Sequence, residues 1–404
     1  MERSTDRILT THAGSLPRPE TLIESNRARL TGESVDEAAF RIRLEDAVHD
    51  VVGRQVATRL HIPNDGEYGH SMGSKVDYAA WWTYVFERLG GTELADVDLM
   101  TMPPVRSEPG KIHLTSFGDR RDRQLFREAY EDPRSGVMMG RPTAQFPVVT
   151  APLTYVGHDA VQRDIANMKA AMSAAGVREG FLNSVAPGSC ARFADAYYGD
   201  EEAFLGACAA AMREEYTAIV DAGLILQLDD PCIAENWDQI SPEPSVADYQ
   251  RYTMLRVEAL NEAIRGLPAD RIRFHLCWGS WHGPHVTDIP MRDIVDVMLK
   301  INAGAYMFEA GNVRHEHEWR VWRDVELPEG KIIMPGVVSH ATNVVEHPEV
   351  VADRIVRYAE GVGRENVVAT TDCGLGGRVH PQIAWAKLES LVAGAELATK
   401  HLWS

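Results

Sequence analysis

His275 and Cys277 are the residues whose types and spacing indicate metal chemistry most directly. They are two positions apart in an apolar run, so in a strand both side chains lie on the same face. Cys373 follows a second apolar run, in TTDCGLGGR, and Glu309 closes a third, in AYMFEAGN. Taken alone, the H-x-C pair also fits a core histidine beside a buried cysteine. Together the four residues supply two thiolates, one imidazole and one carboxylate, and we predict that they hold a catalytic zinc ion.

The charge of this predicted zinc shell indicates which reaction it supports. Two thiolates and a carboxylate leave the site at about minus one if all three are ionised. Such a site is a poor Lewis acid for activating water. It suits a substrate thiol that enters the open position, loses its proton and attacks carbon. The residues therefore favour alkyl transfer to sulfur over hydrolysis.

Short apolar runs alternate with amphipathic stretches along the chain, which is the pattern of a parallel α/β fold. The clearest amphipathic stretches are 201–222, 246–264 and 348–361. We predict a (β/α)8 TIM barrel with one further strand outside it. An open doubly wound sheet is the competing arrangement, but no G-x-G-x-x-G follows any candidate strand. The candidate strands are 8–11, 62–66, 147–151, 180–185, 224–229, 272–277, 303–309, 331–337 and 367–372.

Polar residues gather at the carboxyl ends of these candidate strands, where a (β/α)8 barrel builds its active site. One carboxylate at a strand end is routine, because carboxylates often cap helices and brace loops. A whole series of strand ends that carry metal-ligand or acid-base residues indicates a functional site. The residues at these ends are Ser15, the run 65–67, the pair 229–230, His275, Cys277, Glu309 and the pair 372–373.

Residues 71–145 depart from this alternation. They contain the aromatic segment YAAWWTYVFERLGG, followed by a long polar stretch with several prolines. We predict an insertion after the second strand that covers the barrel mouth, within a single catalytic domain formed by residues 1–404. A strand-helix pair with weak sequence signals is the alternative.

Composition excludes several classes of protein. The 404 residues are 45% hydrophobic, enough for a large core, and the formal net charge of -18 argues against nucleic acid or an anionic membrane as partner. The amino-terminal segment has no apolar run of the kind found in signal peptides. Five cysteines, an odd and small number, argue against a disulfide framework, so we expect a cytoplasmic protein. Nothing in the sequence indicates an oligomeric state.

Seven motifs, in the same order along the chain, resemble the catalytic barrel of cobalamin-independent methionine synthases in its short single-barrel form. They are THAGSLPRP, DGE, LQLDDPCIAE, HLC, MFEAGN, PGVVSHATN and TTDCG. The resemblance implies a zinc barrel that transfers a methyl group to homocysteine, in methionine biosynthesis. It places Ser15 at a substrate-binding turn and makes Glu67 and Asp229 ligands of the acceptor's amino group. It further implies that Glu235 contacts a pterin and that His340 donates a proton, with His275, Cys277, Glu309 and Cys373 as zinc ligands.

The sequence also departs from this family pattern, mainly around the donor. Asp230 replaces a glutamate, and the segment after Pro187 lacks the family's Asn-Trp and offers Phe193 instead. The extra amino-terminal barrel of full-length members, which helps to hold the folate donor, has no counterpart here. The predicted thiol site is therefore better defined than the donor, which could be a folate, a corrinoid, an epoxide or another compound.

Three functional hypotheses follow. The first is methyl transfer to an amino-acid thiol such as homocysteine. The second is addition of coenzyme M or another thiol to an epoxide or other electrophile, as in epoxyalkane:coenzyme M transferase, a short relative; Arg18 and Arg378 would then lie near a sulfonate. The third is a barrel like uroporphyrinogen decarboxylase, which needs no zinc. The partners expected in the first two are a small-molecule thiol and a methyl or alkyl donor.

Overall fold

A curled sheet of seven parallel strands forms the centre of the molecule. The computed structural model describes residues 1–70, 72, 80–95, 102–137, 146–192 and 194–404. The strand order in the sheet is β1-β10-β9-β8-β7-β6-β4, and all neighbours are parallel. Its strands are β1 (Leu9–Thr10), β4 (Phe181–Val185), β6 (Ile225–Asp229), β7 (Ile272–Leu276), β8 (Ala305–Phe308), β9 (Ile332–Val338) and β10 (Val368–Thr371).

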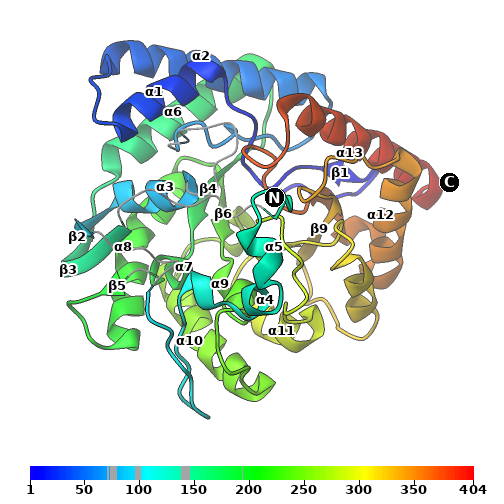
Figure 1. Ribbon diagram of the computed structural model, residues 1–404. Coiled ribbons are helices and arrows are strands. Elements are labelled where there is room, and N and C mark those ends of the chain that lie inside the picture. Colours follow the sequence, from blue (N-terminus) through cyan, green and yellow to red (C-terminus); the bar gives the residue numbers. More distant parts are fainter. Residues whose placement is uncertain (71, 73–79, 96–101, 138–145, 193) are drawn as a thin grey trace.

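Helices surround this sheet on its outer side, as Figure 1 shows. Neighbours pack in the sequence α2, α6, α8, α10, α11, and α12 packs on α13. In the described part of the chain no helix is long and apolar enough to cross a membrane. The helices are α1 (Glu20–Leu30), α2 (Glu37–Ala57), α6 (His158–Ala175), α7 (Pro187–Cys190), α8 (Glu201–Asp221), α9 (Cys232–Glu235), α10 (Val246–Ala263), α11 (Met291–Met298), α12 (Pro348–Val362) and α13 (Pro381–Leu402). Short 3₁₀ helices cover Phe117–Asp119, Ala269–Arg271, Glu316–Arg323 and Arg364–Asn366.

The predicted α/β fold with a curled parallel sheet is confirmed, as are the helices predicted at 201–222, 246–264 and 348–361. The full eight-stranded barrel is not confirmed, because the strands of the described residues form a half-barrel. The expected strand at 62–66 is not a member of the sheet. Its neighbourhood nevertheless lies between both sheet edges: His61 N–H donates to Thr10 (3.1 Å), and Phe181 N–H donates to Pro63 (3.2 Å).

The expected strand at 147–151 lies in a second, smaller sheet. This sheet has the order β2-β3-β5, formed by β2 (Leu89–Ala95), β3 (Phe146–Tyr155) and β5 (Ala194–Asp195). The region predicted as an insertion, 71–145, contributes β2 and three helices, α3 (Ala80–Arg88), α4 (Arg121–Leu125) and α5 (Arg127–Glu131). Positions 71, 73–79, 96–101 and 138–145 of that region lie outside the described residues.

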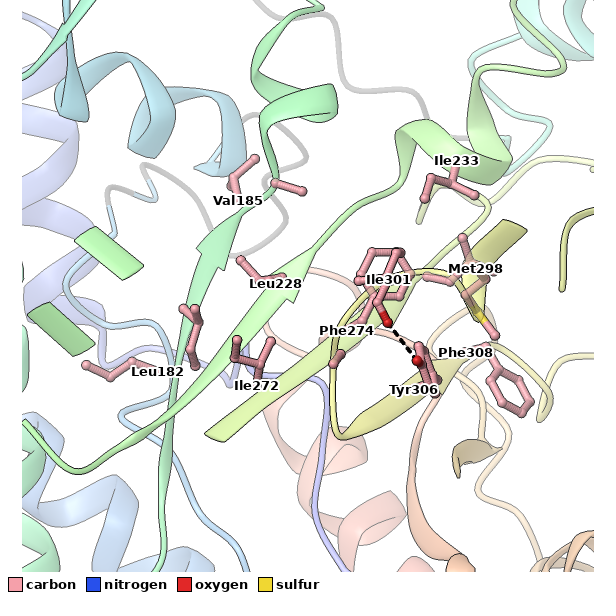
Figure 2. Packing of buried hydrophobic residues seen from close by; sticks show 14 of the residues in the cluster. Leu182, Val185, Leu228, Ile233, Ile272, Phe274, Met298, Ile301, Tyr306 and Phe308 are labelled. Atoms are coloured by element: carbon pink, nitrogen blue, oxygen red, sulfur yellow. Dashed lines mark hydrogen bonds between the residues drawn. The ribbon is translucent and has the colours of Figure 1, made fainter. Parts of the chain in front are cut away.

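The outward faces of the parallel strands form the main hydrophobic core. Successive side chains of a strand point to opposite faces, so Ile272 and Phe274 of β7 share the outer face. Both are fully buried in the same cluster as Leu228 of β6 and Phe308 of β8. Figure 2 shows these side chains together, with the hydroxyl of Tyr306 donating to the carbonyl of Ile301 (2.7 Å). This packing fixes the strands against the helices and leaves the inner face free for polar residues.

The inner face of the curl is polar where β6 and β7 meet, and Arg273 lies at its centre. Its side chain is completely buried and donates to the Gln227 amide oxygen (2.7 Å), the Thr11 hydroxyl (3.1 Å) and the His12 carbonyl (2.9 Å). The guanidinium carbon also lies 3.3 Å from the centre of the Phe181 ring. Because a buried cation is stable only when its donors are satisfied, these bonds tie β7 to the chain beyond β1.

Replacing Arg273 should therefore destabilise the fold. We expect Arg273→Met to lower the free energy of unfolding by about 2–4 kcal/mol, since three buried acceptors lose their donor. Urea unfolding followed by circular dichroism measures the change. Arg271→Met, two residues earlier and more exposed, is the control and should stay within about 0.5 kcal/mol of the parent. Equal stability of Arg273→Met and the parent would contradict this role.

Candidate thiol and metal site

A row of polar side chains crosses the carboxyl ends of neighbouring strands. Asp229 of β6 is in register with His275 of β7, and its carboxylate accepts a hydrogen bond from the ring Nδ1 (2.7 Å). Asn183 of β4 donates to the other oxygen of the same carboxylate (2.9 Å), and Asn64 donates to Asn183 (3.1 Å). The Asp229 carboxylate opposes the effect of burial and raises the pKa of His275 to about 9. With Nδ1 held by Asp229, the ligand atom left on His275 is Nε2.

Cys277 and Cys373 meet at the end of this row. The Cys277 thiol donates a hydrogen bond to Cys373, which lowers the pKa of Cys373 to about 6 and raises that of Cys277 well above its usual value. Cys277 is buried and Cys373 is partly exposed. His275 Nε2 faces the carbonyl of Asp372, the residue before Cys373, at 3.2 Å. Two predicted ligands are thus in contact, and a third lies beside them.

Glu309 is buried next to a carboxylate that the sequence did not single out as a ligand, Asp372. Glu309 accepts from the Trp278 N–H and from the Asn312 amide, both at 2.8 Å, and burial raises its pKa to about 8. Asp372 accepts from the backbone N–H groups of residues 310 and 311 at 2.8 and 2.6 Å, and Asn312 also donates to it (3.2 Å). Asn312 therefore binds both carboxylates and holds the ends of β8 and β10 together.

His340 faces these carboxylates. Among the described residues, Glu309, His340 and Asp372 form a group whose ligand atoms all lie within 4.8 Å of one another. No three of the four predicted ligands meet that limit. His340 is 1% exposed, its Nδ1 is buried with no hydrogen-bond partner in the described residues, and burial holds its pKa well below the usual value.

These residues fit a bound metal ion by their chemistry. A pair of touching thiols, an imidazole whose other nitrogen is fixed by a carboxylate, and a buried glutamate with a raised pKa are a suitable donor set for zinc. The unpartnered Nδ1 of His340 adds a further buried polar atom beside the same glutamate. A cation here would also relieve the repulsion between the neighbouring carboxylates Glu309 and Asp372.

Glu67 and Ser15 lie on the amino-terminal side of the site. Burial, and then the charge of Asp229, raise the pKa of Glu67 well above its usual value. Glu67 has a left-handed backbone with a φ of 58°, which is costly for a residue other than glycine and typical of functional sites. A side chain at Gly14 would collide with Glu67 and Asn183. The Ser15 carbonyl accepts from the N–H groups of residues 375 and 376 (2.9 Å each), against the turn after Cys373.

Glu235, for which the resemblance implies a contact with a pterin, is bound by two arginines. Arg192 donates to one oxygen at 2.8 Å, and Arg120, from the region predicted as an insertion, binds the other. Although burial opposes ionisation, these ion pairs lower the pKa of Glu235 to about 2. The Arg120 guanidinium carbon lies 4.7 Å from the Phe117 ring centre and 4.6 Å from that of Trp281. Both carboxylate oxygens of Glu235 are thus already engaged.

Several residues that contribute to the site could not be identified from the sequence. Asn183 is polar in the middle of an apolar strand, a signal that alternation could have revealed, but Arg120 and Arg192 carry no local signal that points to Glu235. His315, in a polar run of the sequence, is 3% exposed and bonds Asp288 at 3.1 Å, a burial that its polar neighbours in the sequence do not indicate. Phe193, considered as a stacking residue for the donor, lies outside the described residues.

A family model described as "Cobalamin-independent synthase, Catalytic domain" matches residues 147–397, more than half of the chain. The chain belongs to the cobalamin-independent methionine synthase family. Methionine synthase of Saccharolobus solfataricus is 28% identical over 209 residues, which cover 51% of this chain and 54% of that protein. The corresponding protein of Thermococcus kodakarensis is 24% identical over 210 residues, covering 51% and 53%. The matched part thus spans about half the length of these curated relatives.

Two solved structures are similar to this member of the family over nearly their whole length. A B12-independent methionine synthase from Shewanella sp. W3-18-1, solved with selenomethionine, superposes with a TM-score of 0.68 at 19% identity, covering 98% of this chain and 99% of that one. A putative vitamin-B12 independent methionine synthase from Listeria monocytogenes gives 0.63 at 17% identity, with the same coverage. At this identity the likeness shows a common fold.

The thiol pair gives a direct test of the metal site. We expect the purified parent protein to contain close to one zinc per chain, and Cys373→Ser to contain under about 0.2, because loss of one thiolate weakens a tight zinc site strongly. Elemental analysis by mass spectrometry gives the metal content. Cys232→Ser is the matched control: it replaces a buried thiol that donates to Asp230 (2.8 Å), a bond a hydroxyl can also make. Equal zinc in all three proteins would refute the assignment.

Proposed function

We propose that this protein is a zinc-dependent methyltransferase that alkylates the sulfur of an amino-acid thiol, with homocysteine as the acceptor. The observation that supports the proposal is that Glu67 and Asp229 both lie around Asn183 and Gly14, and that Asp229 binds His275, which is two residues before Cys277 on the same strand. An ammonium group beside such a carboxylate pair gains charge-assisted hydrogen bonds. A thiol two or three carbons away from that ammonium group would reach the cysteine pair.

The acceptor would be held by groups that this fold presents at fixed positions. Asp229 is oriented by Asn183, Gln227 and His275, and a substrate ammonium group would use the lone pairs that remain on its two oxygens. Glu67 is held by its unusual backbone and by close packing against Gly14. Ser15 adds a hydroxyl at the turn beside Cys373. The raised pKa of Glu67 would fall when the ammonium group binds, because an opposite charge favours the carboxylate.

His275, Cys277, Glu309 and Cys373 would hold the zinc ion, with Asp372 and His340 beside them. Zinc, when bound, lowers the pKa of a thiol that joins its shell and keeps the sulfur nucleophilic at neutral pH. Trp278 and Asn312 keep Glu309 in place. His340, whose pKa burial holds low in the free protein, would take up a proton beside Glu309 and Asp372 and give it to the leaving group of the donor. In the overall reaction a carbon–sulfur bond forms, the bond from the methyl carbon to the donor breaks, and the donor keeps the electron pair.

Transfer of coenzyme M or another thiol to an epoxide is the second candidate. The support for this candidate is a pair of arginines, Arg18 and Arg378, that could bind a sulfonate. Both already have hydrogen-bond partners. Arg18 donates to the Glu67 carbonyl and to the Met72 sulfur (3.3 Å), and Arg378 donates to the Ser280 hydroxyl (2.9 Å). Two carboxylates where the head group binds would repel a sulfonate. A zinc-free decarboxylase-like barrel would need no contact between Cys277 and Cys373, and zinc analysis distinguishes it.

The finer description of the fold belongs to the same proposal. We infer that residues 61–64 act as the eighth member of a closed (β/α)8 barrel, since their backbone bonds reach Thr10 on one side and Phe181 on the other. Residues 1–404 would then form one catalytic domain, with 71–145 as an insertion that contributes Arg120 to the barrel mouth. We expect the enzyme in the cytoplasm, where small thiols stay reduced.

Removal of the charge on Glu67 should affect only acceptors that carry an amino group. With methyl iodide as a small neutral donor, we expect Glu67→Gln to lower kcat/KM for homocysteine about 10- to 100-fold, the range expected for loss of a charge-assisted hydrogen bond. The reaction of 4-mercaptobutyrate, which lacks the amino group, should change less than about twofold. Methylated product measured by mass spectrometry gives both rates. If the parent prefers coenzyme M to homocysteine, the acceptor assignment is wrong.

Replacement of His340 should lower the rate of transfer from the natural donor more than it lowers the affinity for the thiol. We expect His340→Asn to lower turnover about 10- to 1,000-fold with a donor whose leaving group needs a proton, the range typical of general acids. Turnover with methyl iodide should be nearly unchanged, because iodide leaves without a proton. Homocysteine affinity, from calorimetric titration, serves as the control for the integrity of the site. An equal loss with both donors would rule out the proton-donor role.

A further inference from the structure

His70 lies beside Glu67, the carboxylate proposed to bind the ammonium group of the acceptor. Its ring Nδ1 is 3.9 Å from Glu67 Oε2, and its backbone N–H donates to the Glu67 carbonyl (3.0 Å), so the two residues close one turn of the chain. The other carboxylate oxygen, Oε1, lies at Gly14 and Asn183. Gly14 and Asn183 thus border one oxygen of Glu67, and His70 borders the other.

Tyr84 of α3 holds the ring of His70 by stacking. The two ring centres are 4.0 Å apart and the ring planes differ by 20°. Tyr84 is 2% exposed, and its hydroxyl donates to the buried carboxylate of Glu215, which also accepts from Ser184 (2.8 Å). Because the face and the hydroxyl of Tyr84 are both engaged, this ring is a fixed support for the imidazole.

The same buried cluster supports Asp229, the other carboxylate proposed for the acceptor. Ser184 follows Asn183 in β4, and successive side chains of a strand point to opposite faces. Ser184 therefore binds Glu215 on the outer face, while Asn183 donates to Asp229 (2.9 Å) on the inner face. Tyr84 and Ser184 meet at one carboxylate, so the supports of Glu67 and Asp229 are connected behind the site.

Close packing leaves His70 little room to move. The cavity that it shares with Tyr84 and Asn183 has a volume of about 10 Å³, which is about the space that one water molecule requires. The residue before it, Gly69, is so close to Asp164 of α6 that a side chain there would collide with that carboxylate. The imidazole is therefore confined to its position beside Glu67.

Three arginines keep His70 uncharged. Burial, and then the positive charges of Arg88, Arg18 and Arg163, hold the pKa of His70 well below its usual value. A neutral imidazole can donate one hydrogen bond to a carboxylate without cancelling the charge of that carboxylate. A protonated His70 would be a cation at Glu67 and would compete with the ammonium group of the acceptor. The negative charge of Glu67 is thus left to the substrate.

We propose that His70 is a positioning residue for the acceptor: its Nδ1 donates to Glu67 and orients that carboxylate toward the ammonium group of an amino-acid thiol, while Tyr84 holds the imidazole. The proposal rests on the proposed function and extends acceptor recognition to α3, which lies outside the parallel strands. The separation of 3.9 Å closes to a hydrogen bond when the ammonium group binds, because an ionised carboxylate is the stronger acceptor.

Two replacements of His70 separate the hydrogen bond from the shape of the ring. His70→Phe can still stack on Tyr84 but has no ring nitrogen, whereas His70→Asn places an amide N–H near the position of Nδ1. With methyl iodide as donor, we expect His70→Phe to raise KM for homocysteine about 5- to 20-fold with kcat nearly unchanged. His70→Asn should stay within about threefold of the parent. Methylation of 4-mercaptobutyrate should change less than about twofold in both variants.

His158→Phe is the matched control. His158 also contacts a tyrosine, with its ring edge-on to Tyr155 and the centres 4.9 Å apart, but its side chain is 62% exposed and pairs with Glu214. We expect its KM for homocysteine to change less than about twofold. In a Glu67→Gln background, His70→Phe should have less than about a twofold further effect, because its charged partner is already gone. A full further loss in that background would overturn the positioning role.

A pair of Tyr84 variants tests the support of the imidazole. Tyr84→Phe and Tyr84→Leu both lose the hydroxyl that binds Glu215, and only Tyr84→Leu loses the ring. We expect Tyr84→Phe to keep KM for homocysteine within about twofold of the parent and Tyr84→Leu to raise it about 3- to 10-fold. The preference for homocysteine over 4-mercaptobutyrate is a ratio measured on one protein sample, so a smaller folded fraction does not alter it.

The parent protein separates this proposal from the proposed function. If the parent does not methylate homocysteine, or methylates 4-mercaptobutyrate equally well, the proposed function is wrong. If the parent prefers homocysteine, but His70→Phe lowers the rates of both acceptors equally or of neither, the positioning role is wrong and the proposed function stands. Equal effects of His70→Phe and His70→Asn on homocysteine would also overturn the role of Nδ1.

Discussion

The site depends on one row of hydrogen bonds that runs across the strand ends, from Asn64 through Asn183 and Asp229 to His275. Each member is on a different segment, so the row fixes the relative height and rotation of these segments. A shift of one strand by a single residue would turn its polar side chain to the outer face. The position of His275, and with it the direction of its Nε2 nitrogen, thus follows from strand register.

The same constraint explains why the inner face of the curl can be polar at all. Arg273 lies on the same face of β7 as His275, one side-chain layer below it, and each of its three guanidinium nitrogens donates to a buried acceptor. Buried polar groups are tolerated when every donor and acceptor is paired. The outer face carries the hydrophobic packing, with Phe274 and Leu228, so stability and chemistry use opposite faces of the same strands.

Much of this arrangement could be predicted from the sequence, and the reasons are local. The strands of the main sheet are apolar runs that end in a polar residue, so their positions and the gathering of Asp229, His275 and Glu309 follow from periodicity. The structure of residues 61–64 is harder to predict from periodicity, because this segment makes backbone hydrogen bonds to Thr10 and to Phe181 without forming a regular strand. The interaction of Arg120 with Glu235 joins residues 115 positions apart, and no local pattern encodes it.

The arginine clamp on Glu235 has an evolutionary consequence. Arg120 belongs to a segment outside the parallel strands, whereas the residues proposed to bind the thiol are on the strand ends and the turns that directly follow them. Mutations in the segment can alter what surrounds Glu235 while the cysteine pair and the hydrogen bonds beside it stay unchanged. Under the proposed function, the surroundings of the electrophile can diversify while those of the thiol are retained, so that a single scaffold gives rise to enzymes that share a nucleophile and differ in their electrophile.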